Sequence, residues 1–107
     1  MQNEYRIEKD AFGELKVPAG VYWGIQTQRA LESFFLSGRV VHSSLIGAYC
    51  LVKKACAQTN MELKLLEEKK AQAVIAACDE VIGGKLRGQF PLDALQGGAG
   101  TSTNMNV

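Results

Sequence analysis

The sequence predicts a mainly α-helical domain that begins with a short irregular or hairpin-forming segment. Two stretches in the middle of the chain carry apolar residues at spacings of three and four, which is the pattern of a helix that packs on one side. The first 21 residues instead alternate apolar and polar positions and then break at Pro18 and Gly20. With 107 residues, we expect a single domain over residues 1–107 with a modest core.

The N-terminal stretch predicts a small β-hairpin that turns at residues 10–13. The apolar residues that alternate with polar ones on its two sides are Tyr5, Ile7, Leu15 and Val17. Residues 25–35 then predict a short helix, because Ile25, Ala30 and Phe34 fall on roughly one side of it.

A longer helix is predicted over residues 45–59, after an N-cap at Ser43 or Ser44. Its first two turns, residues 45–52, are apolar almost all round, so we expect them to be buried on most sides. In a chain this short, that requires further helices from sequence outside these residues or from partner chains. Residues 60–65 then form a turn.

The next helix is predicted to begin at Glu67 and Glu68, whose charges suit the positive end of a helix dipole, and to end at Gly83 and Gly84. Its apolar stripe comprises Ala71, Val74, Ile75, Cys78, Val81 and Ile82. The two helices together predict an antiparallel helical hairpin.

Charge and cysteine content exclude several classes of protein. A net charge of +1 provides no basic surface for nucleic acid or for an anionic membrane. No apolar run approaches 18 residues and the N-terminus is polar, so we expect neither a membrane span nor a signal peptide. The three cysteines, Cys50, Cys56 and Cys78, show no CxxC spacing. They are therefore predicted to be buried thiols of a cytoplasmic protein, without disulfides or a metal site.

The segment from Gln96 to Asn106, QGGAGTSTNMN, is the strongest candidate for a binding site. Its glycines allow positive φ and leave backbone N–H groups uncovered, and Thr101 or Ser102 can cap a helix that starts there. Orphan N–H groups and the helix dipole at such a place favour an anion, such as a carboxylate or a phosphate. The segment contains no charged side chain, so binding would rely on dipoles and hydroxyl groups.

Other interpretations of this segment stay open. Residues 98–103 come close to the dinucleotide fingerprint GxGxxG, but no β-branched strand precedes them and Pro91 stands where that strand would lie. A P-loop is excluded because the chain has no GxxxxGK. By spacing alone, a structural glycine turn is the default interpretation, and a carboxylate or small-anion site is the main alternative.

The remaining polar residues do not form a recognisable active site. The single histidine, His42, precedes a helix and is expected on the surface or in a capping role. Arg29 could bind a carboxylate bidentately, or it could make structural hydrogen bonds, which we favour. Asp79, Glu32 and Glu80 have no evident partner, so the chain predicts no pair of carboxylates for acid–base catalysis.

The segment 96–106 closely resembles the first signature segment of aspartate ammonia-lyases, and class II fumarases carry a similar one. Upstream residues agree in order: YRIEKD at 5–10, VP at 17–18, YWGIQTQRA at 22–30, ESF at 32–34, KKA at 53–55, AACDEV at 76–81 and QFP at 89–91. The core GGAGTS at 97–102 favours aspartase, whereas QTQR at 26–29 suits fumarase equally well.

The resemblance implies a lyase that reversibly converts L-aspartate to fumarate and ammonia without an organic cofactor, and we predict no metal-ligating residues in this chain. In that family, removal of the C3 proton forms an aci-carboxylate intermediate with extra charge on its carboxylate oxygens. The resemblance places Thr101, with Gly100 and Ser102 beside it, against that carboxylate, and it leaves Arg29 and Asn104 as further candidates. Donors aimed at the growing charge would act like an oxyanion hole.

The resemblance also implies that these 107 residues are the N-terminal domain of a longer protein. Family members are cytoplasmic homotetramers with a central helical bundle and a C-terminal domain, and three separate segments from different subunits build each active site. The second and third segments, the third with its serine base, are absent here, so no catalytic residue is predicted within this chain and we expect it to be inactive alone. The alternatives are a class II fumarase fragment and a non-catalytic helical interaction module.

Overall fold

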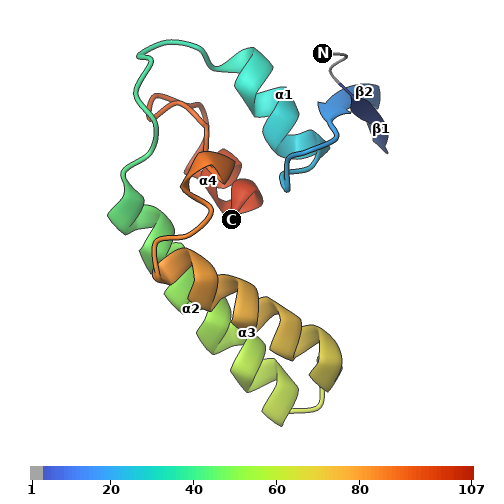
Figure 1. Cartoon of the computed structure of the whole chain (residues 1–107), viewed down its shortest axis with the longest axis vertical. Coiled ribbons are helices and arrows are strands. Elements are labelled where there is room, and N and C mark those ends of the chain that lie inside the picture. Colours follow the sequence, from blue (N-terminus) through green and yellow to red (C-terminus); the bar gives the residue numbers. More distant parts are fainter. Residues whose placement is uncertain (1–3) are drawn as a thin grey trace. The chain divides into compact units, whose positions relative to one another are not determined.

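The computed structural model describes residues 4–107 and divides into two compact units. Unit 1 comprises the chain up to Val41 together with Gln89–Asn106, and unit 2 comprises His42–Gly88 with Val107. Two long helices make up most of unit 2, and unit 1 combines two short α-helices with a two-stranded hairpin (Figure 1), which confirms the predicted mainly α-helical fold class. That residues 1–107 form one domain of a longer protein stays a prediction.

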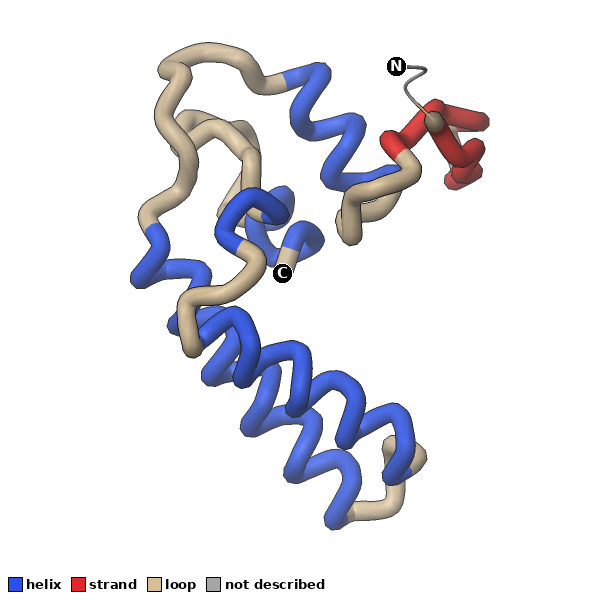
Figure 2. Tube along the Cα trace, in the orientation of Figure 1, coloured by secondary structure: helices blue, strands red, loops and turns tan. Residues whose placement is uncertain are grey.

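The hairpin of unit 1 is formed by β1 (Tyr5–Asp10) and β2 (Gly13–Pro18), shown red in Figure 2. The strands are antiparallel, and their register runs from Tyr5 opposite Pro18 to Asp10 opposite Gly13. Both strands and the turn therefore lie where the alternation of apolar and polar residues predicted them.

The inward face of β1 is polar, unlike that of most half-buried strands. Arg6, Glu8 and Asp10 are half-buried, whereas Tyr5 and Ile7 are 51% and 58% exposed. Hydrogen bonds to the chain that follows the hairpin keep these polar side chains on the inward face of β1.

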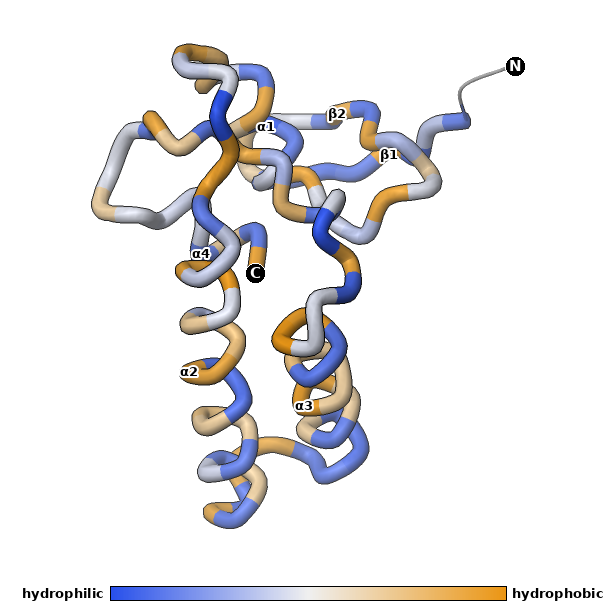
Figure 3. Tube along the Cα trace, turned by 60° about the vertical axis from the view of Figure 1, so that its left-hand side comes forward, coloured by the Kyte–Doolittle hydropathy of each residue, from blue (hydrophilic) through white to orange (hydrophobic). Residues whose placement is uncertain are grey.

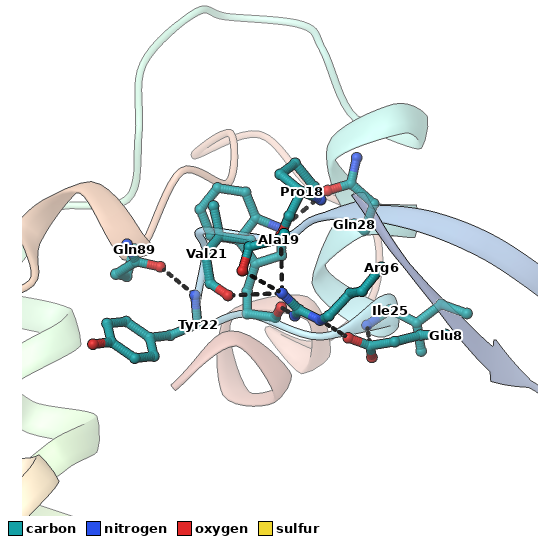
Figure 4. Close-up of polar contacts among 10 residues, drawn as sticks. Arg6, Glu8, Pro18, Ala19, Val21, Tyr22, Ile25, Gln28 and Gln89 are labelled. Atoms are coloured by element: carbon teal, nitrogen blue, oxygen red, sulfur yellow. Dashed lines mark hydrogen bonds and ion pairs between the residues drawn. The ribbon is translucent and has the colours of Figure 1, made fainter. Parts of the chain in front are cut away.

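Arg6 binds that segment through backbone carbonyl groups (Figure 4). Its Nη1 donates to Pro18 O at 2.8 Å and to Val21 O at 2.9 Å, and its Nη2 donates to Trp23 O at 2.5 Å. The Nε atom of Arg6 donates to Glu8 Oε2 at 2.6 Å. A guanidinium group has five N–H donors in a fixed plane, so one side chain can satisfy several carbonyls of an irregular segment.

Glu8 connects this cluster to α1 (Ile25–Ser33). The residue before the helix, Gly24, offers no capping side chain, and Glu8 Oε1 accepts from Ile25 N at 3.0 Å instead. The hydrogen bond from Arg6 lowers the pKa of Glu8, and the bond from Ile25 N acts in the same direction. The helix is confirmed, and it ends two residues earlier than the expected Phe35 because Phe34 is extended.

Unit 2 is an antiparallel pair of helices, α2 (Ser43–Glu62) and α3 (Glu68–Ile82), coloured green and yellow-orange in Figure 1. The expected turn at 60–65 begins later, because α2 continues to Glu62. His42 is the N-cap of α2, and its Nδ1 accepts from Ser44 N at 3.1 Å. The capping role expected for His42 is confirmed, although the cap is His42 itself and not Ser43 or Ser44.

The interface between α2 and α3 is small and apolar. Its buried residues are Ile46, Cys50, Ala57, Ala71 and Cys78. Figure 3 shows hydrophobic positions recurring along both helices, as the stripe in the sequence predicted. Across the pair, Lys54 Nζ lies 2.6 Å from Asp79 Oδ1 in a partly exposed ion pair.

Within this chain α3 covers a single face of α2, so Leu45, Leu51 and Val52 are 48%, 58% and 62% exposed. That helices from outside this chain cover residues 45–52 stays a prediction. One expectation is wrong: Cys56 is exposed, whereas Cys50 and Cys78 are buried as predicted. Burial raises the pKa of the Cys50 thiol, which favours its protonated form. Among the helices of residues 4–107, none combines the length and apolar character needed to cross a membrane.

Candidate functional site

The glycine-rich segment follows a short stretch of unit 1 that pairs with the chain after α1. Val40 and Asp93 form an isolated antiparallel bridge. Ala94 N donates to Arg39 O at 2.7 Å, and Val41 N donates to Leu92 O at 3.3 Å. The start of the segment is thereby fixed to the chain that follows α1.

Asp93 strengthens this attachment through a buried carboxylate, which is 6% exposed. Its Oδ2 accepts from the backbone N–H groups of Leu36, Ser37 and Gly38 at 3.0, 2.8 and 3.1 Å. Its Oδ1 accepts from Ser37 Oγ at 2.6 Å and from Leu95 N at 2.8 Å. These donors, the Ser37 hydroxyl first, hold the pKa of Asp93 far below its usual range.

The glycines of the segment meet real conformational and steric demands. Gly98 and Gly100 have φ of +79° and +83°, a region that side-chain-bearing residues rarely adopt. At Gly97 the constraint is space, because a Cβ there would lie 3.1 Å from Cζ of Phe34. The segment therefore turns twice in the left-handed region while it passes close to an aromatic ring.

The turn leads into α4 (Thr101–Asn106), so a helix begins where the sequence predicted it. Gly100 precedes the helix and its carbonyl accepts from Asn104 N at 3.1 Å, which makes Gly100 the capping position. The expectation that Thr101 or Ser102 caps the helix is wrong. Instead, the side chain of Gln96 caps α4: its Oε1 accepts hydrogen bonds from Thr103 N and Thr103 Oγ1, each at 3.0 Å.

The start of α4 leaves several donors available. Thr101 and Ser102 are the first residues of the helix, so their backbone N–H groups have no acceptor one turn earlier. Thr101 is exposed and Ser102 is half-buried, and their hydroxyls make no side-chain hydrogen bond with residues 4–107. Thr101 Oγ1 lies 3.9 Å from the position that a Cβ on Gly98 would occupy. Two N–H groups and two hydroxyls thus lie together without any formal charge between residues 96 and 107.

Arg29 lies in a different part of unit 1 and is already paired. Its Nε and Nη2 each lie 2.8 Å from one carboxylate oxygen of Asp10, and Nη2 also donates to Gly13 O at 3.2 Å. The hydrogen bond from Arg29 lowers the pKa of Asp10. This bidentate pair supports the structural interpretation of Arg29, and its binding of substrate stays a prediction. Asn104 lies exposed on α4, and its role also stays a prediction.

Sequence reasoning missed two residues of this region, Asp93 and Gln96. Asp93 is the one charged residue in the apolar run 90–95, and a lone carboxylate before a glycine-rich turn is a usable signal. For Gln96 the sequence predicts no more than a place as the first residue of the segment. Within residues 4–107, no three His, Cys, Asp or Glu side chains gather in a way that could hold a metal ion.

Helices α1 to α4, a small hairpin and a charge-free glycine-rich segment fit the predicted helical domain, and comparison with known proteins identifies its class. A family model described as lyase matches residues 13–107, and the chain therefore belongs to this lyase family, the fumarase/aspartase superfamily.

Named relatives fall on both sides of the superfamily. The chain is 50% identical over 107 residues to a class II fumarate hydratase from Halobacterium salinarum, covering 100% of this chain and 23% of the relative. It is 51% identical over 106 residues to an aspartate ammonia-lyase from Bacillus subtilis, covering 99% of this chain and 22% of the relative. The chain thus spans less than a quarter of the length of these two relatives.

Solved structures share the fold. A fumarate lyase:delta crystallin from Brucella melitensis in its native form matches with a TM-score of 0.94 and 48% identity, over 96% of this chain and 24% of that one. A class II fumarase from Schistosoma mansoni matches with a TM-score of 0.92 and 34% identity, over 96% of this chain and 22% of that one.

Proposed function

We propose that this chain is the N-terminal part of a lyase that reversibly converts L-aspartate to fumarate and ammonia. In this proposal Gly100, Thr101 and Ser102 bind a carboxylate of the substrate. The observation that carries the proposal is the start of α4, where uncovered N–H groups and two hydroxyls without side-chain partners follow a turn that only glycine adopts easily.

The chemistry follows from the kind of donor. Removal of a proton from the carbon beside a carboxylate places negative charge on the carboxylate oxygens. Fixed N–H and O–H dipoles stabilise this charge more in the transition state than in the substrate, since the charge grows as the proton leaves. A lysine or arginine would bind the ground-state carboxylate strongly as well, so a charge-free site favours the reaction over simple binding.

The base and the other substrate contacts would come from outside residues 1–107. The chain covers 22–23% of the two named relatives, which leaves room for the remaining segments in a longer polypeptide. By the same resemblance we propose a cytoplasmic homotetramer with active sites shared between subunits, which light scattering of the complete protein would test. We expect the 107-residue chain alone to show no turnover.

A class II fumarase, which would interconvert malate and fumarate, is the second candidate. The chain is 50% identical to a fumarate hydratase and 51% identical to an aspartate ammonia-lyase, so overall sequence identity supports fumarase as well as it supports aspartase. The segment GGAGTS at 97–102 is the reason for placing aspartase first.

Ultraviolet absorbance of fumarate separates these candidates in the complete protein. Fumarate formed from L-aspartate alone would support the first candidate, and fumarate from L-malate alone would support the second. A folded protein that is inactive with both would contradict both reactions and favour another substrate of the superfamily or the non-catalytic module.

Substitution Thr101→Val tests the site itself. Valine keeps the branched shape and removes the hydroxyl, so we expect kcat/KM to fall at least a hundredfold, which is the typical effect of losing one donor to a growing oxyanion. The matched control is Thr59→Val, at an exposed position of α2 remote from the segment in sequence. Near-normal activity of Thr101→Val would remove Thr101 from the site.

A further inference from the structure

We propose that Gln96 is the positioning residue of the carboxylate segment, because its side chain takes over a capping task and so releases the hydroxyls of Thr101 and Ser102 for the ligand. This inference rests on the proposed function. It assigns the geometry of the binding residues Gly100, Thr101 and Ser102 to a residue outside those three.

The start of α4 has no capping side chain at the residue before the helix. The residue that precedes the helix is Gly100, whose φ of +83° suits glycine and which has no side chain to accept a hydrogen bond. A helix N-terminus ordinarily gains an acceptor for its second or third N–H group from a Ser, Thr, Asp or Asn at that position. Here the acceptor must come from elsewhere in the chain.

Gln96 supplies that acceptor across the glycine turn. Its Oε1 accepts from Thr103 N and from Thr103 Oγ1, each at 3.0 Å, and Thr103 is only 3% exposed. Its Nε2 donates to Asp93 O at 2.9 Å. An amide has both an acceptor and a donor, so glutamine alone among side chains of this length and neutral charge can join the helix start to the residue 93 carbonyl.

The chain of contacts continues beyond Gln96. The carboxylate of Asp93 is itself fixed by the N–H groups of residues 36–38 and by Leu95 N. Gln96 therefore connects α4 to a buried and well-anchored carbonyl. A site that is fixed before the ligand arrives loses less free energy on binding, because its donors need no reorientation.

The neutrality of Gln96 also matters. A carboxylate at this position could accept from Thr103, but its negative charge would lie close to the site of an anionic substrate and would repel it. The proposal therefore requires both the amide's acceptor and its lack of charge.

The test uses the complete protein with Gln96→Met, which keeps the length of the side chain and removes both hydrogen-bonding groups. We expect kcat/KM to fall roughly tenfold or more, with changes in both kcat and KM for the amino-acid substrate, at a temperature where circular dichroism shows the variant to be folded. Gln96→Glu should raise KM more than it changes kcat, since the acceptor stays and a repelling charge is added. The matched control is Gln72→Met, an exposed glutamine of α3 that bonds only to Glu68 at 3.0 Å and should leave both constants unchanged.

Combining Gln96→Met with Thr101→Val distinguishes positioning from a general loss of structure. If Gln96 acts through Thr101, Gln96→Met lowers kcat/KM much less in the Thr101→Val variant than in the unmodified protein. Fully additive effects, or Gln96→Met kinetics equal to those of Gln72→Met, would overturn the positioning role while leaving the function intact. A silent Thr101→Val would overturn the proposed site, and with it this inference.

A second readout comes from hydrogen exchange of the Thr103 amide in the 107-residue chain. In Gln96→Met this amide should exchange at least tenfold faster than in the parent chain, and in Gln72→Met it should not change. Unchanged exchange in Gln96→Met would contradict the capping contact directly.

Discussion

The two units of this chain are stabilised by different kinds of interaction. Unit 1 depends on polar side chains that bind backbone groups, above all the half-buried Arg6 with its carbonyl acceptors and the buried Asp93 with its N–H donors. Unit 2 depends on a narrow apolar interface of small residues, such as Ala57, Ala71 and Cys50.

The difference matters for function. Hydrogen bonds are directional and specify where a segment lies, whereas apolar burial is nearly proportional to area and specifies position more loosely. The candidate carboxylate segment belongs to the unit in which irregular backbone is fixed by directional bonds. A helical hairpin can instead provide regular scaffold with few specific contacts.

Two spectroscopic signals separate the units experimentally. The single tryptophan, Trp23, lies in unit 1, and its Nε1 donates to Gln28 Oε1 at 3.0 Å. Far-ultraviolet circular dichroism is dominated by α2 and α3, the longest helices of the described chain. Thermal unfolding followed by both signals therefore reports which unit a substitution affects.

The largest effect is expected for Asp93→Ala. It leaves the partly buried N–H groups of Leu36, Ser37 and Gly38 without their carboxylate acceptor, and each lost bond to a charged acceptor is costly. We expect the unfolding midpoint reported by Trp23 to fall by roughly 15 °C. A fall of less than a few degrees would show that these hydrogen bonds do not stabilise unit 1.

Acid titration tests the contribution of the Asp93 carboxylate to the stability of unit 1. The native pKa of Asp93 is lowered, so its stabilising effect is complete above the pKa of an unfolded aspartate, about 3.9, and is lost as the pH falls through the native pKa. Stability reported by Trp23 should therefore fall below about pH 4. Asp93→Asn should reduce that dependence and leave a remainder from Glu8 and Asp10, whose pKa values are also lowered.

A smaller effect, confined to the other signal, is expected for Ala71→Leu. Ala71 is fully buried on the face of α3 that meets α2, and three added carbons must displace neighbours. Overpacking of this kind costs about 1–3 kcal/mol, so the midpoint reported by circular dichroism should fall by roughly 10 °C. Ala73→Leu, at an exposed position of the same helix, is the matched control and should change little.

A smaller effect again is expected for Arg6→Lys, and the smallest for Lys54→Met. Lysine keeps the charge but cannot direct donors to Pro18 O, Val21 O and Trp23 O together, so the Trp23 midpoint should fall by roughly 5 °C. Lys54→Met removes the partly exposed ion pair of unit 2 and should change the circular-dichroism midpoint by no more than about 2 °C. Equal effects of the two substitutions would remove the contrast between the units.

Sequence patterns were sufficient for the regular elements. The alternation around residues 10–13 gave the hairpin, and the stripe from Ala71 to Ile82 gave α3. Both signals are local periods that a strand or a helix must obey wherever it packs. The start of α4 after the glycines was predictable for the same reason, since Gly98 and Gly100 carry a backbone requirement of their own.

The order of hairpin and helices, the glycine turn and its lack of charge could all be predicted from the amino-acid sequence alone. Tertiary structure alone decided that Arg6 faces inward, that Asp93 binds residues 55–57 positions earlier, and that Gln96 rather than Thr101 caps α4. It also decided that Cys56 is exposed. The physical reason is that a hydrogen bond between distant residues depends on where the whole backbone brings its partners, and no local period encodes that position.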